Sequence, residues 1–267
     1  ILQQAKESKI EIIGEVELAI RFLEWSKVVG ITGTNGKTTL TSLLYHVLKQ
    51  TVHYSVEMYG NIGNPLSLAS KMDISLVELS SFQLDTTYTP FLDTGVLLNI
   101  STDHLDRYPD MNGYAASKCS IGSLLKDHGE FIVSSGVWES YKNKIKDSLN
   151  SVSQTIKVIY PPKQDWIDKL NKLGANHLLL SGFEGETVLI AQYICQKWGI
   201  NEQDFMDAVV TFKKPEHRME WIRNWKGIEF FNDSKATNPD AVEKGIKAFK
   251  NKVHLIVGGE SKGCQFF

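Results

Sequence analysis

The sequence has few cysteines, little net charge and no long apolar segment. Three cysteines occur among its 267 residues, Cys119, Cys195 and Cys264, and without a CxxC pair they suggest neither a disulfide framework nor a zinc site. The net charge of −2 gives no electrostatic reason to expect nucleic acid or a membrane surface as a partner. No apolar run approaches the roughly 20 residues that cross a bilayer. We therefore expect a soluble, cytoplasmic protein.

Both ends of the sequence differ from those of a complete protein. The chain begins at Ile1 rather than at a methionine, and Phe267 closely follows a strand-like run and a glycine turn. We therefore expect a fragment, or the ordered parts of a longer chain. Hydrophobic residues make up 42% of the sequence and charged residues 22%, which is typical of a globular protein with an ordinary core.

Apolar strand-like runs alternate with helical patterns, which predicts an α/β fold with a mainly parallel sheet. Strands are expected at residues 28–32, 74–79 and 95–100. Between the first two, leucine and valine at positions 40, 43, 44, 47 and 48 repeat at helical spacing. Polar residues end the second and third runs, and the carboxyl ends of parallel strands are where α/β proteins build their sites.

A Lys-Lys-Pro break at residues 213–215 precedes a second unit. Beyond it we expect a strand at 228–231, a polar loop at 232–239, a helix at 241–249 and a strand at 253–257. This order of elements indicates the start of a Rossmann-like domain at the C-terminal end.

A glycine-rich loop joins the first expected strand to the helix. It consists of Gly33, Thr34, Asn35, Gly36, Lys37, Thr38 and Thr39. Such a loop turns consecutive N–H groups toward phosphate oxygens, and the helix N-terminus adds its positive dipole end. Lys37 is expected to reach the β- and γ-phosphates of a nucleotide, and the Thr38 hydroxyl suits Mg²⁺. The alternative is a simple glycine turn in which Thr34 or Asn35 caps the helix.

Two further candidates lie at the ends of expected strands. Glu78 closes the second run, where a P-loop enzyme often places a carboxylate for its metal ion. His104 follows the third run within Asp-His-Leu-Asp-Arg. Taken singly, Glu78 could be a surface residue and His104 a loop histidine without a ligand. Their matching positions behind a phosphate loop favour a metal site.

Together these residues resemble the Mur ligase family in order and spacing. The matching segments are residues 33–39, 60–63, 78–83, 99–107, 114–118, 217–220 and 232–238. Lys118, in the helical stretch 114–118, would by itself be a solvated lysine, and only this resemblance makes it a candidate. The Ser-Ser-Phe-Gln and Asn-Asp-Ser-Lys-Ala-Thr-Asn segments look like those of the D-glutamate-adding members.

The resemblance implies three domains and a reaction. Residues 1–14 would end an N-terminal uridine-nucleotide domain, 15–213 would form the central ATP-binding domain, and 214–267 would begin the C-terminal amino-acid-binding domain. The implied enzyme, expected to be a monomer, uses ATP to join D-glutamate to UDP-N-acetylmuramoyl-L-alanine in peptidoglycan synthesis. The reaction passes through an acyl phosphate, because a free carboxylate is a poor acyl donor.

The resemblance also implies roles for single residues. Lys37 would hold the transferring phosphoryl group, while Thr38 and Glu78 would bind one Mg²⁺. His104 and Lys118 would serve a second Mg²⁺. For that role Lys118 would be carbamylated by CO₂, since a protonated lysine cannot bind a cation. The residues expected at the muramoyl substrate are Asn61, Ser80 and Gln83.

Residues of the C-terminal unit are assigned to ATP and to closure of the site. Those expected at ATP are His217, Arg218 and Asp233. Those expected to close over D-glutamate and the acyl phosphate are Lys235, Thr237 and Lys262. The alternative for Asp233 and Lys235 is a capped loop before the following helix, and for Lys262 an exposed turn.

One segment departs from the family pattern. Members carry Gly-x-His-Asn with a further asparagine three residues on, whereas residues 182–188 here read Gly-Phe-Glu-Gly-Glu-Thr-Val. Gly185 and Val188 stand where the two asparagines would help to bind ATP. We therefore expect altered nucleotide contacts, with the phosphate and metal residues retained.

Two other functions compete with this interpretation. A folylpolyglutamate synthase, a related amide ligase, would differ in lacking the uridine-nucleotide domain. A P-loop switch or motor would hydrolyse ATP without forming an amide, and the segments around Lys118 and Lys235 would then have no role. ATP hydrolysis that ignores D-glutamate and the muramoyl substrate would favour the switch.

Overall fold

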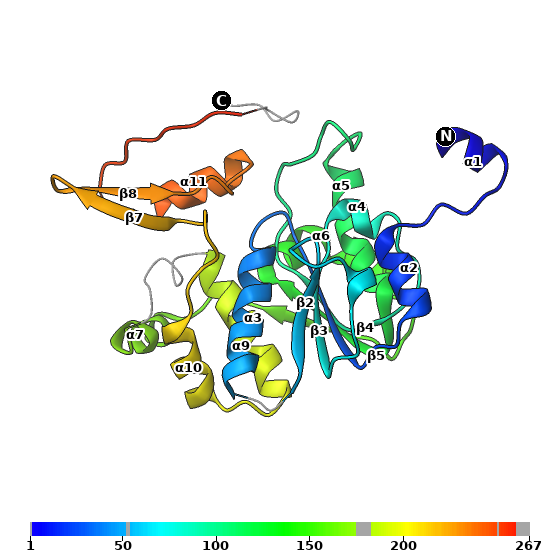
Figure 1. Ribbon diagram of the computed structural model, residues 1–267, viewed down its shortest axis with the longest axis horizontal. Helices are drawn as coiled ribbons and strands as arrows, with labels where there is room; N and C mark the ends of the chain where they lie inside the picture. Colours follow the sequence, from blue (N-terminus) through cyan, green and yellow to red (C-terminus); the bar gives the residue numbers. More distant parts are fainter. Residues whose placement is uncertain (1, 52–53, 175–182, 250, 260–267) are drawn as a thin grey trace.

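The computed structural model describes residues 2–51, 54–174, 183–249 and 251–259. The strands of its main sheet are β1 (Lys27–Thr32), β2 (Val56–Gly60), β3 (Ile74–Glu78), β4 (Leu92–Leu97), β5 (Leu125–Ser134) and β6 (Thr155–Ile159). They form a six-stranded sheet in the order β2-β3-β1-β4-β5-β6, and every neighbouring pair is parallel (Figure 1). The α/β fold with a parallel sheet is therefore confirmed.

Both faces of this sheet are buried under helices, and successive side chains of a strand point to opposite faces. In β1, Val29 and Ile31 belong to one hydrophobic cluster and Val28 to the other. The helices packed on the first face are α3 (Lys37–Thr51), α9 (Phe183–Lys197) and α10 (Glu202–Thr211). Those on the second face are α2 (Glu15–Phe22), α4 (Ser81–Leu84), α5 (Met111–Cys119) and α6 (Ser135–Asp147).

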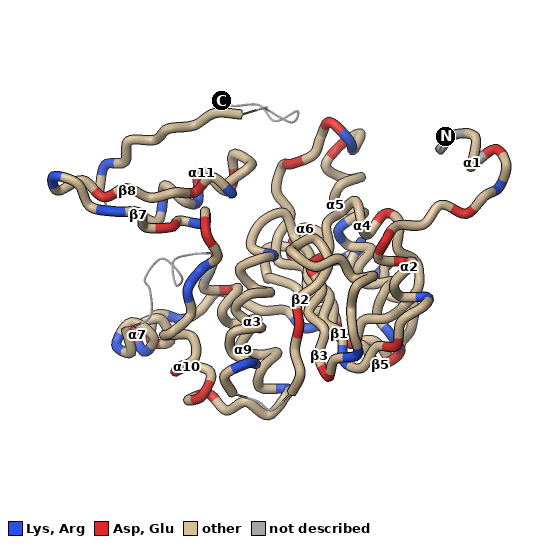
Figure 2. Tube along the Cα trace, viewed as in Figure 1, with Lys and Arg blue, Asp and Glu red and all other residues tan. Residues whose placement is uncertain are grey.

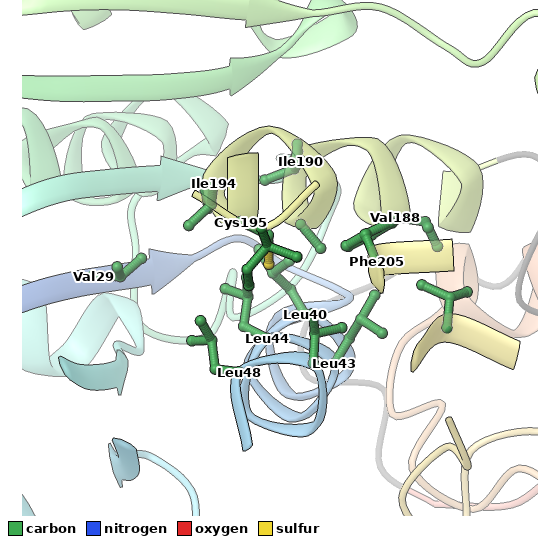
Figure 3. Packing of buried hydrophobic residues seen from close by; sticks show 14 of the residues in the cluster. Val29, Leu40, Leu43, Leu44, Leu48, Val188, Ile190, Ile194, Cys195 and Phe205 are labelled. Carbon is green, nitrogen blue, oxygen red and sulfur yellow. The ribbon is translucent and has the colours of Figure 1, made fainter. Parts of the chain in front are cut away.

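Helix α3 has the apolar stripe that its sequence predicts. Its residues Leu40, Leu43, Leu44, Val47 and Leu48 are each 0% exposed. The four leucines share a cluster with residues of α9 and β1 (Figure 3). Burying a leucine side chain contributes about 1.5–3 kcal/mol, so this stripe anchors the helix firmly. The loop that precedes α3 therefore has a fixed position at the carboxyl edge of the sheet.

The expected strand at 95–100 lies three residues too late in the sequence. Strand β4 spans Leu92–Leu97. Beyond it, the Leu98 N–H donates to the Thr32 carbonyl at 3.0 Å and the Asn99 carbonyl accepts from the Thr34 N–H at 2.9 Å. Asn99 consequently lies beyond the strand, level with the end of β1, where it can contact the glycine-rich loop.

The C-terminal unit contains a two-stranded antiparallel sheet, β7 (Glu220–Trp225) and β8 (Ile228–Asn232), and helix α11 (Pro239–Lys247). The expected strand at 228–231 and helix at 241–249 are confirmed with small changes in their ends. The expected strand at 253–257 is wrong. Within the described residues this segment has no strand beside it, and a strand forms only where a neighbour satisfies its N–H and C=O groups.

The remaining elements are α1 (Leu2–Glu7), η1 (Leu66–Leu68), η2 (Ser120–Leu124) and α7 (Gln164–Lys172). Among the described helices, none has the length and apolar character that crossing a membrane requires. Acidic and basic positions are interspersed along the trace in Figure 2, consistent with a net charge near zero.

Candidate functional site

The glycine-rich loop between β1 and α3 is held in shape by Asn99. The Asn99 side chain accepts a hydrogen bond from the backbone N–H of Asn35 at 2.9 Å and donates one to the Asn35 carbonyl at 2.8 Å. Gly33 and Gly36 have φ values of +151° and +85°, which favour glycine. The loop is therefore ordered by a side chain from the neighbouring strand end.

Lys37 folds back over this loop. Its Nζ atom donates to the carbonyl oxygens of Gly33 at 2.9 Å and Thr34 at 3.0 Å. Burial lowers the pKa of Lys37, while the nearby Glu78 carboxylate acts in the opposite direction. The lysine thus presents its charge at the centre of the loop, where a phosphate would lie if the loop binds one.

Two oxygen-bearing side chains converge beside the loop. The Thr38 hydroxyl donates to Oε2 of Glu78 at 2.9 Å, and Asn61 Nδ2 donates to Oε1 of the same carboxylate at 2.9 Å. Glu78 is only 1% exposed, at the end of β3. Only glycine fits at position 60, because a Cβ there would lie 2.2 Å from the Glu78 carbonyl oxygen. Gly60 therefore lets the backbone before Asn61 pass close to Glu78. A hydroxyl and a buried carboxylate are suitable ligands for a hard cation.

The C-terminal unit reaches the same place through Arg218. Its guanidinium donates to the Thr38 hydroxyl oxygen at 2.8 Å. Asp233 and His217 instead order their own segment. Asp233 Oδ1 accepts from the Met219 N–H at 3.0 Å, and burial raises the Asp233 pKa. The side-chain amide of Asn232 donates to Nδ1 of His217 at 2.7 Å.

Lys118 is buried, so its interpretation as a solvated helix lysine is wrong. The residue is 2% exposed, and its Nζ atom donates to the Thr32 hydroxyl at 3.3 Å and lies 5.4 Å from the Tyr114 ring centroid. Burial lowers its pKa well below the usual lysine value, and the positive charge of Lys37 adds to this effect. A lysine amine that loses its proton more readily is a better nucleophile.

His104 is also a neighbour of Tyr114. The centroids of these two rings are 6.2 Å apart, and the His104 ring is 4.8 Å from the Phe82 ring. The backbone at His104 is left-handed, with φ 54°, and its Nε2 atom is 3.7 Å from an oxygen of Asp103. The fold therefore brings both expected residues of the second metal site against one tyrosine. Among the described residues, no group of three or more histidine, cysteine or acidic side chains is arranged to hold a metal ion.

Ser80 and Gln83 form a capping box at the start of α4. The Ser80 hydroxyl oxygen accepts from the Gln83 N–H at 3.2 Å, and Gln83 Oε1 accepts from the Ser80 N–H at 2.9 Å. Reciprocal bonds of this kind satisfy the first N–H groups of a helix. Both side chains thus shape the segment that follows Glu78.

The loop between β8 and α11 contains two further expected residues. Lys235 and Thr237 are exposed there, and the Lys235 N–H donates to the His217 carbonyl at 3.1 Å. Asn238 caps α11 by accepting from the Ala241 N–H at 2.9 Å, so the capped loop considered from the sequence is present. Lys262 lies outside the described residues.

The segment that departs from the family pattern starts α9. Val188 is 0% exposed and packs in the cluster with Leu40 and Leu43, so its side chain faces the core (Figure 3). Gly185 is also buried, and Glu186 accepts a hydrogen bond from the Ser135 hydroxyl at 3.1 Å. Gly182 lies outside the described residues. Val188 is therefore a core residue rather than a nucleotide contact.

Several residues with central positions were given no role from the sequence. They are Thr32, Asn99, Ser101, Tyr114, Asn238 and Asp240. The available signal was the position of polar residues after strand ends and at a helix N-cap. Nothing in local sequence shows which of these side chains meet in space.

Comparison with known proteins gives a consistent family assignment. Residues 31–220 match the family model described as the Mur ligase middle domain. The UDP-N-acetylmuramoylalanine–D-glutamate ligase of Protochlamydia amoebophila (strain UWE25) is 37% identical over 280 aligned positions, covering 100% of this chain and 61% of the relative. The enzyme of the same name from Caldicellulosiruptor bescii is 33% identical, covering 98% of this chain and 61% of the relative. The chain thus spans about three-fifths of the length of these relatives.

Solved structures share the fold at low sequence identity. The MurF ligase of Thermotoga maritima in complex with ADP has a TM-score of 0.64 at 16% identity, covering 88% of this chain and 60% of that chain. E. coli FolC in complex with DHPP and ADP has a TM-score of 0.65 at 14% identity, covering 90% of this chain and 71% of that one. Fold alone does not separate these enzymes, whereas the family model matches most of the sequence. The chain therefore belongs to the Mur ligase family, with that family's middle domain at residues 31–220.

Proposed function

We propose that this chain is the ATP-binding part of a cytoplasmic ligase that joins D-glutamate to UDP-N-acetylmuramoyl-L-alanine. The observation that carries the proposal is the convergence of Glu78 and Arg218, from separate parts of the chain, on Thr38 of the glycine-rich loop that also holds Lys37. The sequence relatives that bear the D-glutamate ligase name support the substrates. We assign residues 1–14, 15–213 and 214–267 to the N-terminal, central and C-terminal domains.

The first chemical step transfers the γ-phosphoryl group of ATP to the substrate carboxylate. The N–H groups of residues 33–39 and the ammonium of Lys37 neutralise phosphate charge, and Arg218 adds a cation from the C-terminal unit. Since the transferred group carries its charge on oxygens, positioning and neutralisation supply most of the rate enhancement.

A magnesium ion fits the pair Thr38 and Glu78. Both offer oxygen atoms, which lie 2.9 Å apart at a buried strand end, and Mg²⁺ prefers such ligands together with phosphate oxygens. When bound, the ion would withdraw charge from the β- and γ-phosphates. Asn61 keeps the carboxylate oriented through its hydrogen bond to Oε1 of Glu78.

A second Mg²⁺ is assigned to His104 and a carbamylated Lys118. The buried Lys118 amine, with its lowered pKa, fits this modification because only the neutral amine attacks CO₂. The reaction forms an N–C bond, releases one proton and leaves an anionic carbamate. Both residues neighbour the Tyr114 ring, which supports placing them in one site.

The second chemical step is attack of the D-glutamate amine on the acyl phosphate. Asn61, Ser80 and Gln83 lie around the end of β3 and are assigned to the muramoyl substrate. Lys235, Thr237 and Lys262 are assigned to D-glutamate and the acyl phosphate. His217 and Asp233, beside Arg218, are assigned to ATP. The new amide bond forms as phosphate leaves.

Phosphate release from ATP by the full-length protein tests the proposal. UDP-N-acetylmuramoyl-L-alanine is supplied together with D-glutamate, L-glutamate or meso-diaminopimelate. We expect release that requires both the muramoyl substrate and D-glutamate. Release without either would favour a P-loop switch, and release with a pteroate substrate and L-glutamate would favour a folylpolyglutamate synthase.

A further inference from the structure

We infer that Asp240 is a positioning residue that latches helix α11 onto the phosphate loop. Its Oδ2 atom accepts hydrogen bonds from Asn35 Nδ2 at 2.9 Å and from the Ser101 hydroxyl at 2.9 Å. Asn35 belongs to the loop itself, and Ser101 follows strand β4. One carboxylate oxygen thus joins the C-terminal unit to two adjacent segments of the central region.

Asn238 strengthens the same contact. Its side-chain amide donates to Asn35 Oδ1 at 2.9 Å and to Asp103 Oδ2 at 3.4 Å. Asn238 is 6% exposed, whereas helix α11, which it caps, contains no buried residue. The burial of Asn238 therefore comes from the loop before α11 meeting the central region. Asn35 is consequently held at two places. Asn99 bonds to its backbone, and Asn238 and Asp240 bond to its side-chain amide.

The charge of Asp240 suits this position. Lys244, one helical turn on, donates to Asp240 Oδ2 at 2.7 Å, and the Asp240 side chain is 27% exposed. The carboxylate also lies in the first turn of α11, where a negative charge is favourable. A helix-end role alone explains neither the bond to Asn35 nor the bond to Ser101, since both donors lie outside the C-terminal unit.

The latch holds Arg218 within reach of the phosphate loop. Arg218 contacts Thr38 while Asp240 contacts Asn35, so the C-terminal unit contacts the loop at two separate residues. Loss of the Asp240 bonds removes one of these ties and leaves the loop side chains intact. We expect weaker nucleotide binding and a more open loop, because the closed arrangement becomes less populated.

The experiment uses the full-length protein, with Asp240→Ala compared against Glu243→Ala. Glu243 is an exposed acidic residue of the same helix that pairs with Lys247, so its removal changes charge and helix content similarly without touching the loop. Binding of a non-hydrolysable ATP analogue with Mg²⁺ is measured by calorimetry, and hydrogen exchange is measured at residues 33–38. The variant Ser101→Ala and its combination with Asp240→Ala complete a double-mutant cycle.

We expect Asp240→Ala to weaken analogue binding about tenfold and to speed exchange in the loop, while Glu243→Ala leaves both unchanged. Ser101→Ala has a smaller effect in the Asp240→Ala background than alone. Equal behaviour of Asp240→Ala and Glu243→Ala, or fully additive effects of Ser101→Ala and Asp240→Ala, would overturn the inference. Analogue binding and hydrogen exchange are both measured without product formation. A failure to use D-glutamate in the assay above would therefore contradict the proposed function without deciding the role of Asp240.

Discussion

The Thr38 hydroxyl and the Glu78 carboxylate are joined by a 2.9 Å hydrogen bond between the first turn of α3 and the end of β3. The two residues are forty positions apart in the chain. Their meeting follows from the parallel pairing of β1 with β3, which aligns Ile31 with Glu78 at the carboxyl edge. The end of β3, the start of α3 and the loop that joins β1 to α3 therefore form one oxygen-lined site.

Replacing Glu78 by glutamine tests the charge at this site. The amide keeps the size of the side chain and an oxygen for Asn61, but it is a poor Mg²⁺ ligand. We expect phosphate release by the full-length protein to fall about 10²-fold, with a higher Mg²⁺ concentration needed for half-maximal rate. Glu130→Gln is the control, since Glu130 is a largely buried carboxylate on β5 that pairs with Tyr193 and Lys197. An unchanged Mg²⁺ requirement in Glu78→Gln would contradict the assignment.

Gly60→Ala tests the close approach that brings Asn61 to Glu78. At φ +98°, an added Cβ would lie 2.2 Å from the Glu78 carbonyl oxygen. We expect a loss of more than about 2 kcal/mol in the free energy of unfolding, together with reduced activity. Gly63→Ala is the matched control, because Gly63 also has positive φ, +62°, but has nothing within 4 Å of an added Cβ. Its cost, measured by the same denaturant titration, should be about 1 kcal/mol. Equal costs would show that the contact with Glu78 is unimportant.

Glu17 anchors helix α2 to the segment after α4. Its carboxylate accepts from the Tyr88 N–H at 2.8 Å, the Thr89 hydroxyl at 2.7 Å and Arg21 Nε at 2.8 Å. Burial raises its pKa, but the hydrogen bonds outweigh burial and lower the pKa from 4.5 to about 2. A lowered pKa stabilises the folded state fully above pH 4.5 and progressively less as the pH falls toward 2.

We therefore expect Glu17→Gln to destabilise the protein at pH 7 by about 2 kcal/mol. The difference from the unmodified protein should shrink as the pH falls below 4.5. Glu24→Gln, which removes an exposed carboxylate paired with Lys71, should have almost no effect at either pH. Thermal unfolding at pH 7 and pH 3 measures both. A Glu17→Gln deficit that stays constant with pH would disprove the role given to the ionised carboxylate.

Much of this fold follows from local periodicity in the sequence, because helices and buried strands depend on residues that are near one another in the chain. The helix of Leu40 to Leu48 and the end of β3 at Glu78 follow from apolar spacing and strand length. The prediction of a strand at 253–257 is wrong because strand formation also depends on residues far away in the chain. Its apolar run is compatible with a strand, but pairing depends on a neighbouring strand that no local pattern specifies.

Long-range contacts limit what the sequence reveals about the site. Asn35 and Asp240 are 205 positions apart, and neither belongs to a pattern that indicates their contact. Val188 shows the reverse difficulty. Alignment to a family motif suggested a nucleotide position, whereas the helical spacing of α9 buries that side chain in the same hydrophobic cluster as Leu40. The burial of Lys118 is likewise visible only in the structure, where Thr32 and Tyr114 contact its amine. A helical pattern in the sequence does not show which other segments cover a given side chain.

The burial of Lys118 makes a prediction about stability and pH. Its pKa in the folded protein is well below 10.5, mainly because burial disfavours the ammonium, so the unfolded chain binds a proton that the folded chain does not. Stability therefore falls as the pH drops from about 10.5 toward the folded pKa. Methionine has similar length and no charge, so Lys118→Met should remove this cost.

We expect Lys118→Met to unfold at a higher temperature than the unmodified protein at pH 7, in CO₂-depleted buffer without nucleotide. The gain should diminish as the pH rises toward 10.5, because the unfolded chain then carries a neutral lysine as well. Lys142→Met, at an exposed position of α6, should show no such pH-dependent gain. A Lys118→Met protein that is less stable at every pH would mean that the buried amine is charged and paired, and that it is therefore unsuited to react with CO₂.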